Sequence, residues 1–514
     1  MKVLLLSLQR NLNILGLKLL HQILLERGYD SNLLYLNRFN KENKRMLDAL
    51  KGFVRDLNPS WVGISVTASE FHDAKEITYF LKREFDSFPV IWGGIQATTA
   101  VERCVQIADY LCVGEGEQTV VDICEALTYG KPLKDINNLA WFEDGEIKVN
   151  PLNPIIEDLD SLPFVPRLAQ KTFILPKDNV MPLTRKLYMK YSAFYGGIYR
   201  IMQSRGCPHK CSYCVNSIFP KLYHNWRVRW TSPKRMVDEI VAGVSEDLPL
   251  LFISIFNDNF FAQTTEQMRE FFDLYKKRVG KPLILFSSPN FLTEEKLKMA
   301  VDGGLASIHV GLQTGSESVC KNVYNRQMTP QKFKEVAEII HKYPVVPYYD
   351  IICDNPFETE EDQIETVKVL MGLSKPYFFL IFSLTLYEGT DLRERVKKEK
   401  PEFLHDDTTK DFLVPAPTEL NHLQHFATIF PAWAVNYLLN RYREKRNSWF
   451  TKLLFKIYML VGYFFLQPLI YLWILLKFNR YSLTKFFKNL PKFIDFRALN
   501  IFGHFHTGRD STYE

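Results

Sequence analysis

Three cysteines, Cys207, Cys211 and Cys214, lie close together in the stretch "RGCPHKCSYCVN", residues 205–216. A tetrahedral zinc site takes four ligands, and disulfides take cysteines in pairs. Three thiolates can each bind one iron of a cubane iron–sulfur cluster and leave the fourth iron open to another ligand. Zinc with a distant fourth ligand is the alternative, since His209 lies inside the loop. The neighbours of the cysteines favour the iron–sulfur cluster, because Tyr213 comes just before the third cysteine and the stretch directly follows a predicted strand.

The composition is typical of a folded protein of several domains. A chain of 514 residues is too long for one ordinary core, and 46% of its residues are hydrophobic. Eight unevenly spaced cysteines do not suit a disulfide scaffold, so we expect reduced thiols and a cytoplasmic location. The apolar start is too short for a signal peptide. The net charge of +6 comes largely from one basic stretch near the carboxyl end, and we expect no nucleic-acid partner.

Strand-like and helix-like patterns alternate over residues 1–140 and predict an open, mostly parallel α/β sheet of the doubly wound, Rossmann-like type. Ligands of such sheets bind at the carboxyl ends of the strands. The loops expected there are small or rich in glycine, which lets a bulky ligand approach the backbone. The candidate binding residues in these loops are Ser65, Gly93, Gly94, Gly114, Glu115, Gly116 and Glu117.

Two further segments complete the α/β part of the chain. Prolines punctuate residues 141–190, which we interpret as a linker packed between domains because it also carries Leu, Ile and Phe. Over 191–400 the alternation returns with six β/α units. This number predicts a partial (β/α)6 barrel of the TIM type, with its chemistry at the carboxyl ends of the strands.

Residues 401–514 form a mostly helical region with one uncharged, apolar run of twenty residues, 457–476. The run is long enough to cross a bilayer. Basic residues flank it on both sides, however, and Gln467–Pro468 lies at its middle. We therefore expect a re-entrant or interfacial segment on the inner face of the membrane. A buried helical pair in a C-terminal cap is the alternative.

The cysteine loop resembles the signature of the radical S-adenosylmethionine (SAM) superfamily, C-x3-C-x-aromatic-C. Later stretches are similar to other motifs of that superfamily, in the same order. They are "NDNFF" (257–261), "VGLQTGSES" (310–318), "NRQMT" (325–329), "DNPFETEED" (354–362) and "LYEGTDL" (386–392). The last two depart from the usual pattern at Asp354, Asn355, Phe357 and Glu388.

This resemblance implies a role for several residues. Cys207, Cys211 and Cys214 would hold a [4Fe–4S] cluster and be catalytic through it, and SAM would bind to its open iron. Tyr213 would cover the adenine of SAM. The remaining SAM contacts implied are Asn257 and Asp258 at the amino group, and Gln313 and Ser316 at the ribose and carboxylate.

The N-terminal part resembles the cobalamin-binding domain that precedes many radical SAM barrels. The similar stretches are "VIWGGIQAT" (90–98), "ADYLCVGEGEQTV" (108–120) and "LDSLPFVPR" (159–167). No Asp-x-His-x-x-Gly occurs near the first loop, so the resemblance implies cobalamin whose lower face has no such histidine ligand. A retained fold with an empty or repurposed cleft is the alternative.

The two resemblances together imply a radical SAM methyltransferase that methylates an unreactive carbon. Ring formation or rearrangement, with or without cobalamin, is the second hypothesis, and a membrane-associated metal-binding protein without SAM chemistry is the third. We expect an electron donor of the flavodoxin or ferredoxin type and a small-molecule substrate. The apolar run suggests that the substrate is hydrophobic or lipid-like.

The other cysteines give no second metal site. Cys104, Cys112 and Cys124 are interpreted as small buried hydrophobes, and Cys320 as structural. Cys353 ends a strand and is interpreted as structural or close to the substrate. For His72, His309 and His341 we expect roles in the core or at the surface.

Overall fold

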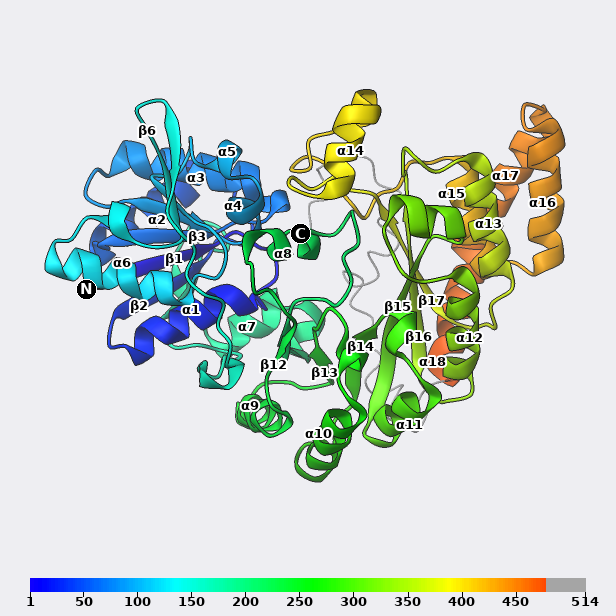
Figure 1. Ribbon diagram of the computed structural model, residues 1–514, viewed down its shortest axis with the longest axis horizontal. Helices are drawn as coiled ribbons and strands as arrows, with labels where there is room; N and C mark the ends of the chain where they lie inside the picture. Colours follow the sequence, from blue (N-terminus) through cyan, green and yellow to red (C-terminus); the bar gives the residue numbers. More distant parts are fainter. Residues whose placement is uncertain (478–514) are drawn as a thin grey trace.

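The computed structural model describes residues 1–477 as two α/β domains followed by a helical region (Figure 1). This arrangement confirms the predicted fold class. The first domain is built on the strands β1 (Lys2–Ser7), β2 (Asp30–Tyr35), β3 (Trp61–Ser65), β4 (Val90–Gly93), β5 (Tyr110–Cys112), β6 (Leu139–Glu143), β7 (Glu146–Val149), β8 (Thr172–Ile174) and β9 (Met181–Pro182).

These nine strands form one sheet in the order β7-β6-β5-β4-β3-β1-β2-β8-β9. The strands from β5 to β8 in this order are parallel, and β6, β7 and β9 are antiparallel additions at the edges. Helices cover both faces, which is why the central strands are apolar on both sides. The helices are α1 (Leu15–Glu26), α2 (Lys44–Leu57), α3 (Phe71–Glu84), α4 (Ile95–Thr99), α5 (Val101–Cys104) and α6 (Glu117–Tyr129).

The proline-rich residues 141–190, predicted as a linker, supply most of these edge strands. Pro182 is tolerated in β9 because a strand at the sheet edge need not donate every backbone hydrogen bond. The same segment also contacts the second domain. The Val165 N–H donates to Glu239 Oε1 over 2.9 Å, and Arg167 Nη2 donates to the Gly196 carbonyl over 2.7 Å. The segment therefore packs between the domains, as expected, and extends the first sheet, which its prolines did not reveal.

The second domain contains the predicted partial barrel, a curved sheet of six parallel strands in chain order. Its strands are β10 (Ile198–Ile201), β13 (Phe252–Ile255), β14 (Leu283–Ser287), β15 (Leu305–Gln313), β16 (Val346–Cys353) and β17 (Phe378–Ser383). A short antiparallel ribbon of β11 (Ser204–Arg205) and β12 (Arg229–Trp230) follows β10, and its pairing was not predicted.

Helices alternate with these strands, and most begin at a hydroxyl side chain. The helices are α7 (Arg185–Tyr191), which precedes the barrel, α8 (Phe219–Leu222), α9 (Pro233–Ser245), α10 (Thr265–Arg278), α11 (Glu294–Asp302), α12 (Pro330–His341), α13 (Glu360–Met371) and α14 (Asp391–Glu399). A side-chain oxygen that accepts a free N–H of the first turn fixes where such a helix begins. For α9 to α13 these oxygens belong to Ser232, Thr264, Thr293, Thr329 and Thr359.

The helical region lies against the last barrel strands, at the right of Figure 1. A π-helical turn, η10 (Gly462–Leu466), joins its last two helices into one continuous rod. The rod passes through Gln467–Pro468 without a break, so the re-entrant form of the predicted segment is wrong, and the interfacial form stays a prediction. Residues 478–514 of the predicted region lie outside the described residues. Its helices are α15 (Glu419–Ile429), α16 (Ala432–Lys445), α17 (Trp449–Val461) and α18 (Gln467–Lys477).

Candidate active site between the two sheets

Ion pairs hold the carboxyl edge of the first sheet against the second domain. Glu115, in the loop after β5, lies 2.6 Å from Arg229 and 3.2 Å from Arg205, and Glu117 lies 2.5 Å from Arg205. Burial alone raises the pKa of Glu115, but the two guanidinium groups outweigh it and lower that pKa below its usual value. Since Arg205 comes two residues before Cys207, these contacts tie the cysteine loop to the first domain.

The same loop needs glycine because a tyrosine from the second domain enters it. Gly114 has a φ of +84°, and a Cβ there would lie 2.1 Å from the hydroxyl oxygen of Tyr223. This hydroxyl accepts the Glu115 N–H over 2.9 Å. Any side chain at position 114 would therefore displace Tyr223 and separate the two edges.

The predicted cofactor residues of the first domain lie along this one edge. Ser65 and Gly93 end the neighbouring strands β3 and β4 and pair in register. Gly94 has a φ of +91°, and a Cβ there would lie 2.9 Å from the Val66 carbonyl oxygen. The carboxylates of Glu115 and Glu117 instead face arginines, so their part of the loop offers a ligand mainly its backbone.

Unpaired polar atoms at this edge fit a bulky polar cofactor. Asn37 comes two residues after β2, and Gln96 is the second residue of α4. Asn37 Oδ1 and Gln96 Nε2 are buried and have no hydrogen-bond partner among the described residues. Buried polar atoms usually find a partner, and a ligand with amide groups would supply one. The edge therefore suits cobalamin. The loop after β1 carries no histidine, in agreement with the sequence.

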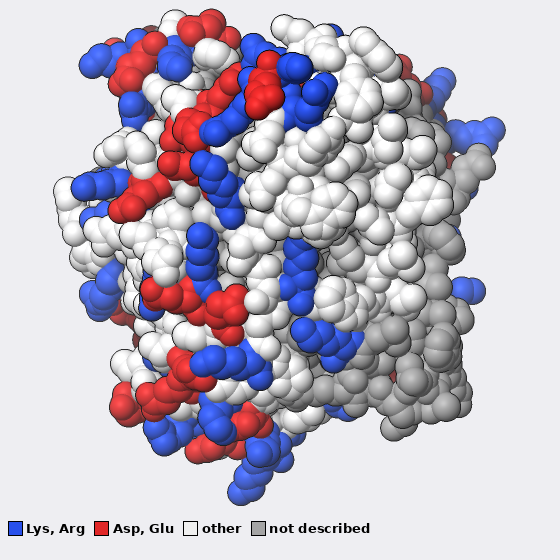
Figure 2. Space-filling model, turned by 90° about the vertical axis from the view of Figure 1, so that its right-hand side faces the viewer, with Lys and Arg blue, Asp and Glu red and all other residues white. Residues whose placement is uncertain are grey.

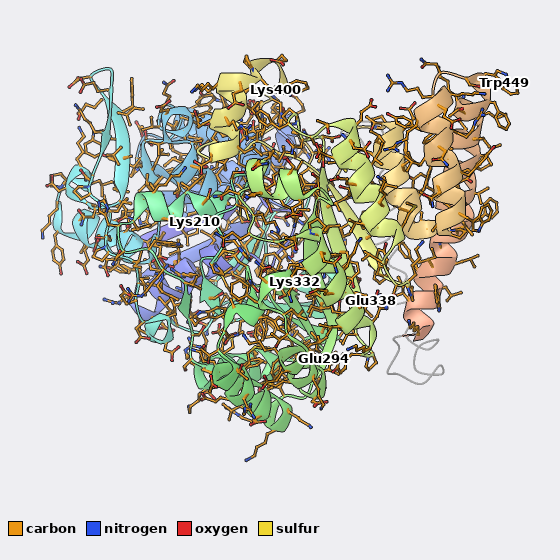
Figure 3. All side chains as sticks on the ribbon, turned by 45° about the vertical axis from the view of Figure 1, so that its right-hand side comes forward. Lys210, Glu294, Lys332, Glu338, Lys400 and Trp449 are labelled. Carbon is orange, nitrogen blue, oxygen red and sulfur yellow. The ribbon has the colours of Figure 1, made fainter. Side chains whose placement is uncertain are left out.

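The cysteine loop leaves β11 and folds onto residues 323–326. The Ser212 N–H donates to the Tyr324 carbonyl over 2.9 Å, and the Ser212 hydroxyl donates to the Val323 carbonyl over 2.6 Å. The ring of Tyr213 meets the edge of the Tyr324 ring, with centroids 4.9 Å apart. The loop, marked by Lys210 in Figure 3, is thus held on one side by residues 323–326, while Arg205 at its start pairs with Glu117 of the first domain. Cys207, Cys211 and Cys214 are free thiols on it.

The donor set of this loop fits a cluster better than a single zinc ion. His209, the candidate fourth ligand, bonds instead to the Ser288 hydroxyl over 2.8 Å and packs on Phe291. Within residues 1–477, no three His, Cys, Asp or Glu side chains are grouped to hold one metal ion. A cubane needs no such grouping, because each cysteine binds a different iron. Burial raises the pKa of the Cys207 thiol to about 11, so iron must displace its proton.

Arg326 also belongs to the site, although its role was not predicted from the sequence. Its Nη1 lies 3.9 Å from Cys211 Sγ and 3.3 Å from the Tyr213 hydroxyl, and its Nη2 donates to the Gly311 carbonyl over 2.8 Å. The guanidinium is buried and places a positive charge beside a cysteine sulfur. The stretch "NRQMT" was the available signal.

Asn257 and Asp258, predicted to meet the amino group of SAM, lie next to the cysteine loop. Asn257 Oδ1 accepts the backbone N–H groups of Gln203 and Ser204 over 2.8 and 3.2 Å, so it shapes the entry to the loop. Its Nδ2 is buried without a partner in the described chain. Burial raises the pKa of Asp258, against the effect of a hydrogen bond from Asn216.

Gln313 ends β15 and Ser316 comes three residues later, but the two differ in the polar atoms that remain free for a ligand. Gln313 has a φ of +68°, and its Oε1 is buried with no partner among the described residues. A Cβ on Gly311 would lie 2.2 Å from Gln313 Nε2, so the glycine makes room for this amide. The Ser316 hydroxyl already donates to Asp362 over 2.6 Å. The same oxygen accepts the Val319 N–H over 3.3 Å, so one lone pair remains for a ligand.

A row of aromatic side chains crosses the inner face of the barrel. Phe286, His309, Tyr348 and Phe378 pair in register on β14 to β17, with stacked ring centroids 4.6, 4.3 and 4.5 Å apart. Burial lowers the pKa of His309 to about 4, so the row carries no charge at neutral pH. At the end of the row, the ring of Tyr471 from α18 packs on Phe378, with ring centroids 5.0 Å apart. His309, for which we expected a role in the core or at the surface, stacks between Phe286 and Tyr348 in this row.

Asp350 is the acidic group next to the row, two residues along β16 from Tyr348. It pairs in register with Gly311 and Leu380. Its Oδ1 is buried with no partner in residues 1–477, and burial raises its pKa to about 7. Unpaired buried carboxyls are costly, and they are more frequent at functional sites than elsewhere.

The remaining cysteines are buried outside the cysteine loop. Cys104, Cys112 and Cys124 are buried in the first domain, as predicted. Cys353 is buried on the outer side of β16, where its thiol donates to Gln424 Oε1 over 3.0 Å, so a position near the substrate is wrong. Cys320 is buried as well, in agreement with a structural role.

Two family models match the chain. The model of the radical SAM superfamily matches residues 201–370, and the model of the B12 binding domain matches residues 1–124. An uncharacterized methyltransferase of Pyrococcus horikoshii is 25% identical over 344 residues, which are 66% of this chain and 70% of the relative. An anaerobic magnesium-protoporphyrin IX monomethyl ester cyclase of Rubrivivax gelatinosus is 25% identical over 63% of this chain and 56% of its own length.

Solved structures show the same fold at low sequence identity. The radical SAM methyltransferase TsrM of Kitasatospora setae, with tryptophan substrate and a SAM analogue bound, has a TM-score of 0.63 at 18% identity, over 77% of this chain and 76% of its own. The cobalamin-dependent SAM radical enzyme OxsB has a TM-score of 0.61 at 15% identity, over 89% and 70%.

Replacing one loop cysteine tests the cluster site. We expect Cys207→Ala to lose most of its iron and sulfide after anaerobic reconstitution, whereas the wild type takes up about four of each per chain. Cys104→Ala, which changes a buried thiol outside the loop, serves as the matched control and should keep the full content. Iron and sulfide assays with visible absorption make the measurement. Equal iron in the two variants would contradict this assignment.

Arg326 should tune the reduction potential of the cluster. Removing a positive charge 3.9 Å from Cys211 Sγ disfavours the reduced, more negative state, so we expect Arg326→Gln to lower the potential. Lys210→Gln removes an exposed charge from the same loop and should change it little, because water screens that charge. Redox titration followed by electron paramagnetic resonance measures both. A potential that is the same in both variants and the wild type would argue against the role.

Asp350 should make stability depend on pH. Its folded-state pKa of about 7 lies above the unfolded value, so ionising it inside the fold costs stability as pH rises from about 4 to 7. We therefore expect Asp350→Asn to raise the melting temperature at pH 8 and to lose this advantage as pH falls toward 4. Asp86→Asn, at an exposed position, should show no such trend. Melting curves across this pH range decide, and a pH-independent difference would refute the buried-carboxyl interpretation.

Proposed function

The chain is a radical SAM enzyme with an N-terminal B12-binding domain, and from this premise we propose that it is a cobalamin-dependent methyltransferase acting on an unactivated carbon. The two domains imply a [4Fe–4S] cluster, SAM and cobalamin as cofactors. Methyl transfer is supported by the methyltransferase relative of Pyrococcus horikoshii, which matches two thirds of the chain.

One observation carries the proposal. The carboxyl edges of the two sheets face each other, and the Glu115–Arg229 and Glu117–Arg205 ion pairs fix their separation. Residues suited to cobalamin line one edge, and the cysteine loop lies at the other. When bound, the cluster with SAM would supply a 5′-deoxyadenosyl radical, and cobalamin would supply a methyl group.

The chain's own residues would then bind and orient. Cys207, Cys211 and Cys214 would hold the cluster, and Arg326 would place its charge beside one of them. The unpaired amide atoms Asn257 Nδ2 and Gln313 Oε1 can each form one hydrogen bond to SAM.

The inner face of the barrel suits an apolar substrate. The row of Phe286, His309, Tyr348 and Phe378 is neutral and offers flat ring surfaces. Asp350, one layer closer to the carboxyl edge, can accept a hydrogen bond from an N–H or O–H group of that substrate. These features support a small hydrophobic or lipid-like molecule with one polar group.

Ring closure is the second candidate. It is favoured by the cyclase relative of Rubrivivax gelatinosus, of which this chain spans just over half the length. Both reactions would begin with hydrogen abstraction at the same site, and they differ in whether a methyl group is transferred. Either one needs a one-electron donor, and we propose a protein of the flavodoxin or ferredoxin type.

Isotope labelling separates the two reactions. Reconstituted enzyme with cobalamin and a reductant is incubated with SAM carrying a deuterated methyl group and a small-molecule and lipid extract of the source cells. We expect 5′-deoxyadenosine, S-adenosylhomocysteine and a product whose mass includes the labelled methyl group. Cys207→Ala is the matched control and should form none of them. A product without label, formed with 5′-deoxyadenosine, would refute methyl transfer in favour of ring closure, and absence of SAM cleavage would refute both.

A further inference from the structure

The helical region carries an extended apolar face that no described part of the chain covers. Figure 2 shows this side of the molecule as a broad white area with separate basic side chains, and with acidic side chains gathered to one side. Monomeric soluble proteins rarely expose so continuous an apolar surface without using it. The outer face, as we call it, consists of the exposed side chains Trp433, Tyr437, Trp449, Leu453, Ile457, Leu460, Phe464, Phe465, Leu469, Leu472 and Trp473.

We propose that the outer face lies on the surface of a bilayer with anionic lipids, with the rod of α17, η10 and α18 parallel to the membrane plane. The rod is apolar enough for this role, since Trp449–Ile474 has a mean hydropathy of 1.7 and only 17% of its most apolar window is buried. As a helix, Trp449–Ile474 is about 39 Å long, so an apolar strip of about this length would lie along the membrane surface.

Contacts along the inner side of the rod argue against a membrane crossing. The Tyr458 hydroxyl donates to the Ala434 carbonyl over 3.1 Å, and the Tyr463 hydroxyl lies 3.0 Å from His422 Nδ1. Near the other end, Tyr471 packs on Phe378 of the barrel. A crossing would therefore carry the barrel edge and these polar groups into the hydrocarbon layer, where unpaired polar groups are costly. An interfacial position immerses only the outer face.

The charges select an anionic lipid surface over a second protein. Residues 445–477 contain no Asp or Glu, and Lys452 and Lys456 are exposed beside the apolar side chains. Neither lysine forms an ion pair in the part of the chain that the structure describes. Their alkyl chains can lie along the apolar surface while the ammonium groups reach lipid phosphates.

The aromatic ends of the outer face agree with the same placement. Trp449 begins the rod on the outer side of the molecule (Figure 3), and Trp473 lies close to its other end. Tryptophan favours the boundary between headgroups and acyl chains, because its ring is apolar and its N–H is polar. Trp433, on α16, adds a third anchor and is 75% exposed.

Vesicle flotation tests the proposal with the full-length protein. We expect wild type to float with vesicles of phosphatidylcholine and phosphatidylglycerol, and less with phosphatidylcholine alone. Leu460→Asp with Phe464→Asp should weaken this binding at least about tenfold, since it removes two exposed apolar contacts. Tyr129→Asp, at an exposed position of the first domain, is the matched control and should bind like wild type.

A second variant isolates the charge contribution. Lys452→Glu with Lys456→Glu should abolish the preference for anionic vesicles while the melting temperature and iron content stay unchanged. Failure of folded wild type to bind either vesicle would overturn the proposal, as would equal binding of the Leu460→Asp/Phe464→Asp variant. A dimer in light scattering that this variant dissociates would instead assign the face to a second copy. None of these outcomes depends on the reaction catalysed.

Discussion

The ion pairs between Glu115, Glu117, Arg205 and Arg229 are the constraint on which the site depends. A parallel sheet binds ligands at its carboxyl edge, and this chain has two such edges. Their ligands can react only if the edges face each other at a fixed separation. Buried charges are costly when unpaired. If one domain slid against the other, both the glutamates and the arginines would lose their partners. Misalignment is thereby disfavoured by several groups at once.

The same contacts explain why the cysteine loop has its own ribbon. β11 and β12 carry Arg205 and Arg229, and the loop with the three cysteines begins directly after Arg205. A shift of the first domain would therefore move Arg205 and, two residues further along the backbone, Cys207. On the other side, Ser212 and Tyr213 are held by residues 323–326. The loop is fixed between two supports, which reduces the loss of conformational freedom when a ligand binds.

The sequence predicted features that depend on local pattern. Alternating strand-like and helix-like patterns indicated the two α/β domains, and three closely spaced cysteines indicated the metal site. It could not predict features set by pairing between distant segments. Arg326 reaches Cys211 across 115 positions. The aromatic row exists only because the registers of β14 to β17 align His309 with Phe286 and Tyr348. Segments of the linker form β7, β8 and β9 because they lie beside the edges of the first sheet and hydrogen-bond to them.

The rod at the carboxyl end shows how a local irregularity preserves a surface. Pro468 lacks an N–H and cannot bond to the carbonyl four residues earlier, which usually bends a helix. Here that carbonyl belongs to Phe464, inside the π-helical turn, where the wider winding accommodates the defect. Arg443 and Arg446 of the α16 region pair with Glu361 and Glu360 of α13, so the helices are anchored to the barrel. A continuous, anchored rod keeps its exposed apolar side chains on the side away from the barrel, because the helix is not interrupted at the proline.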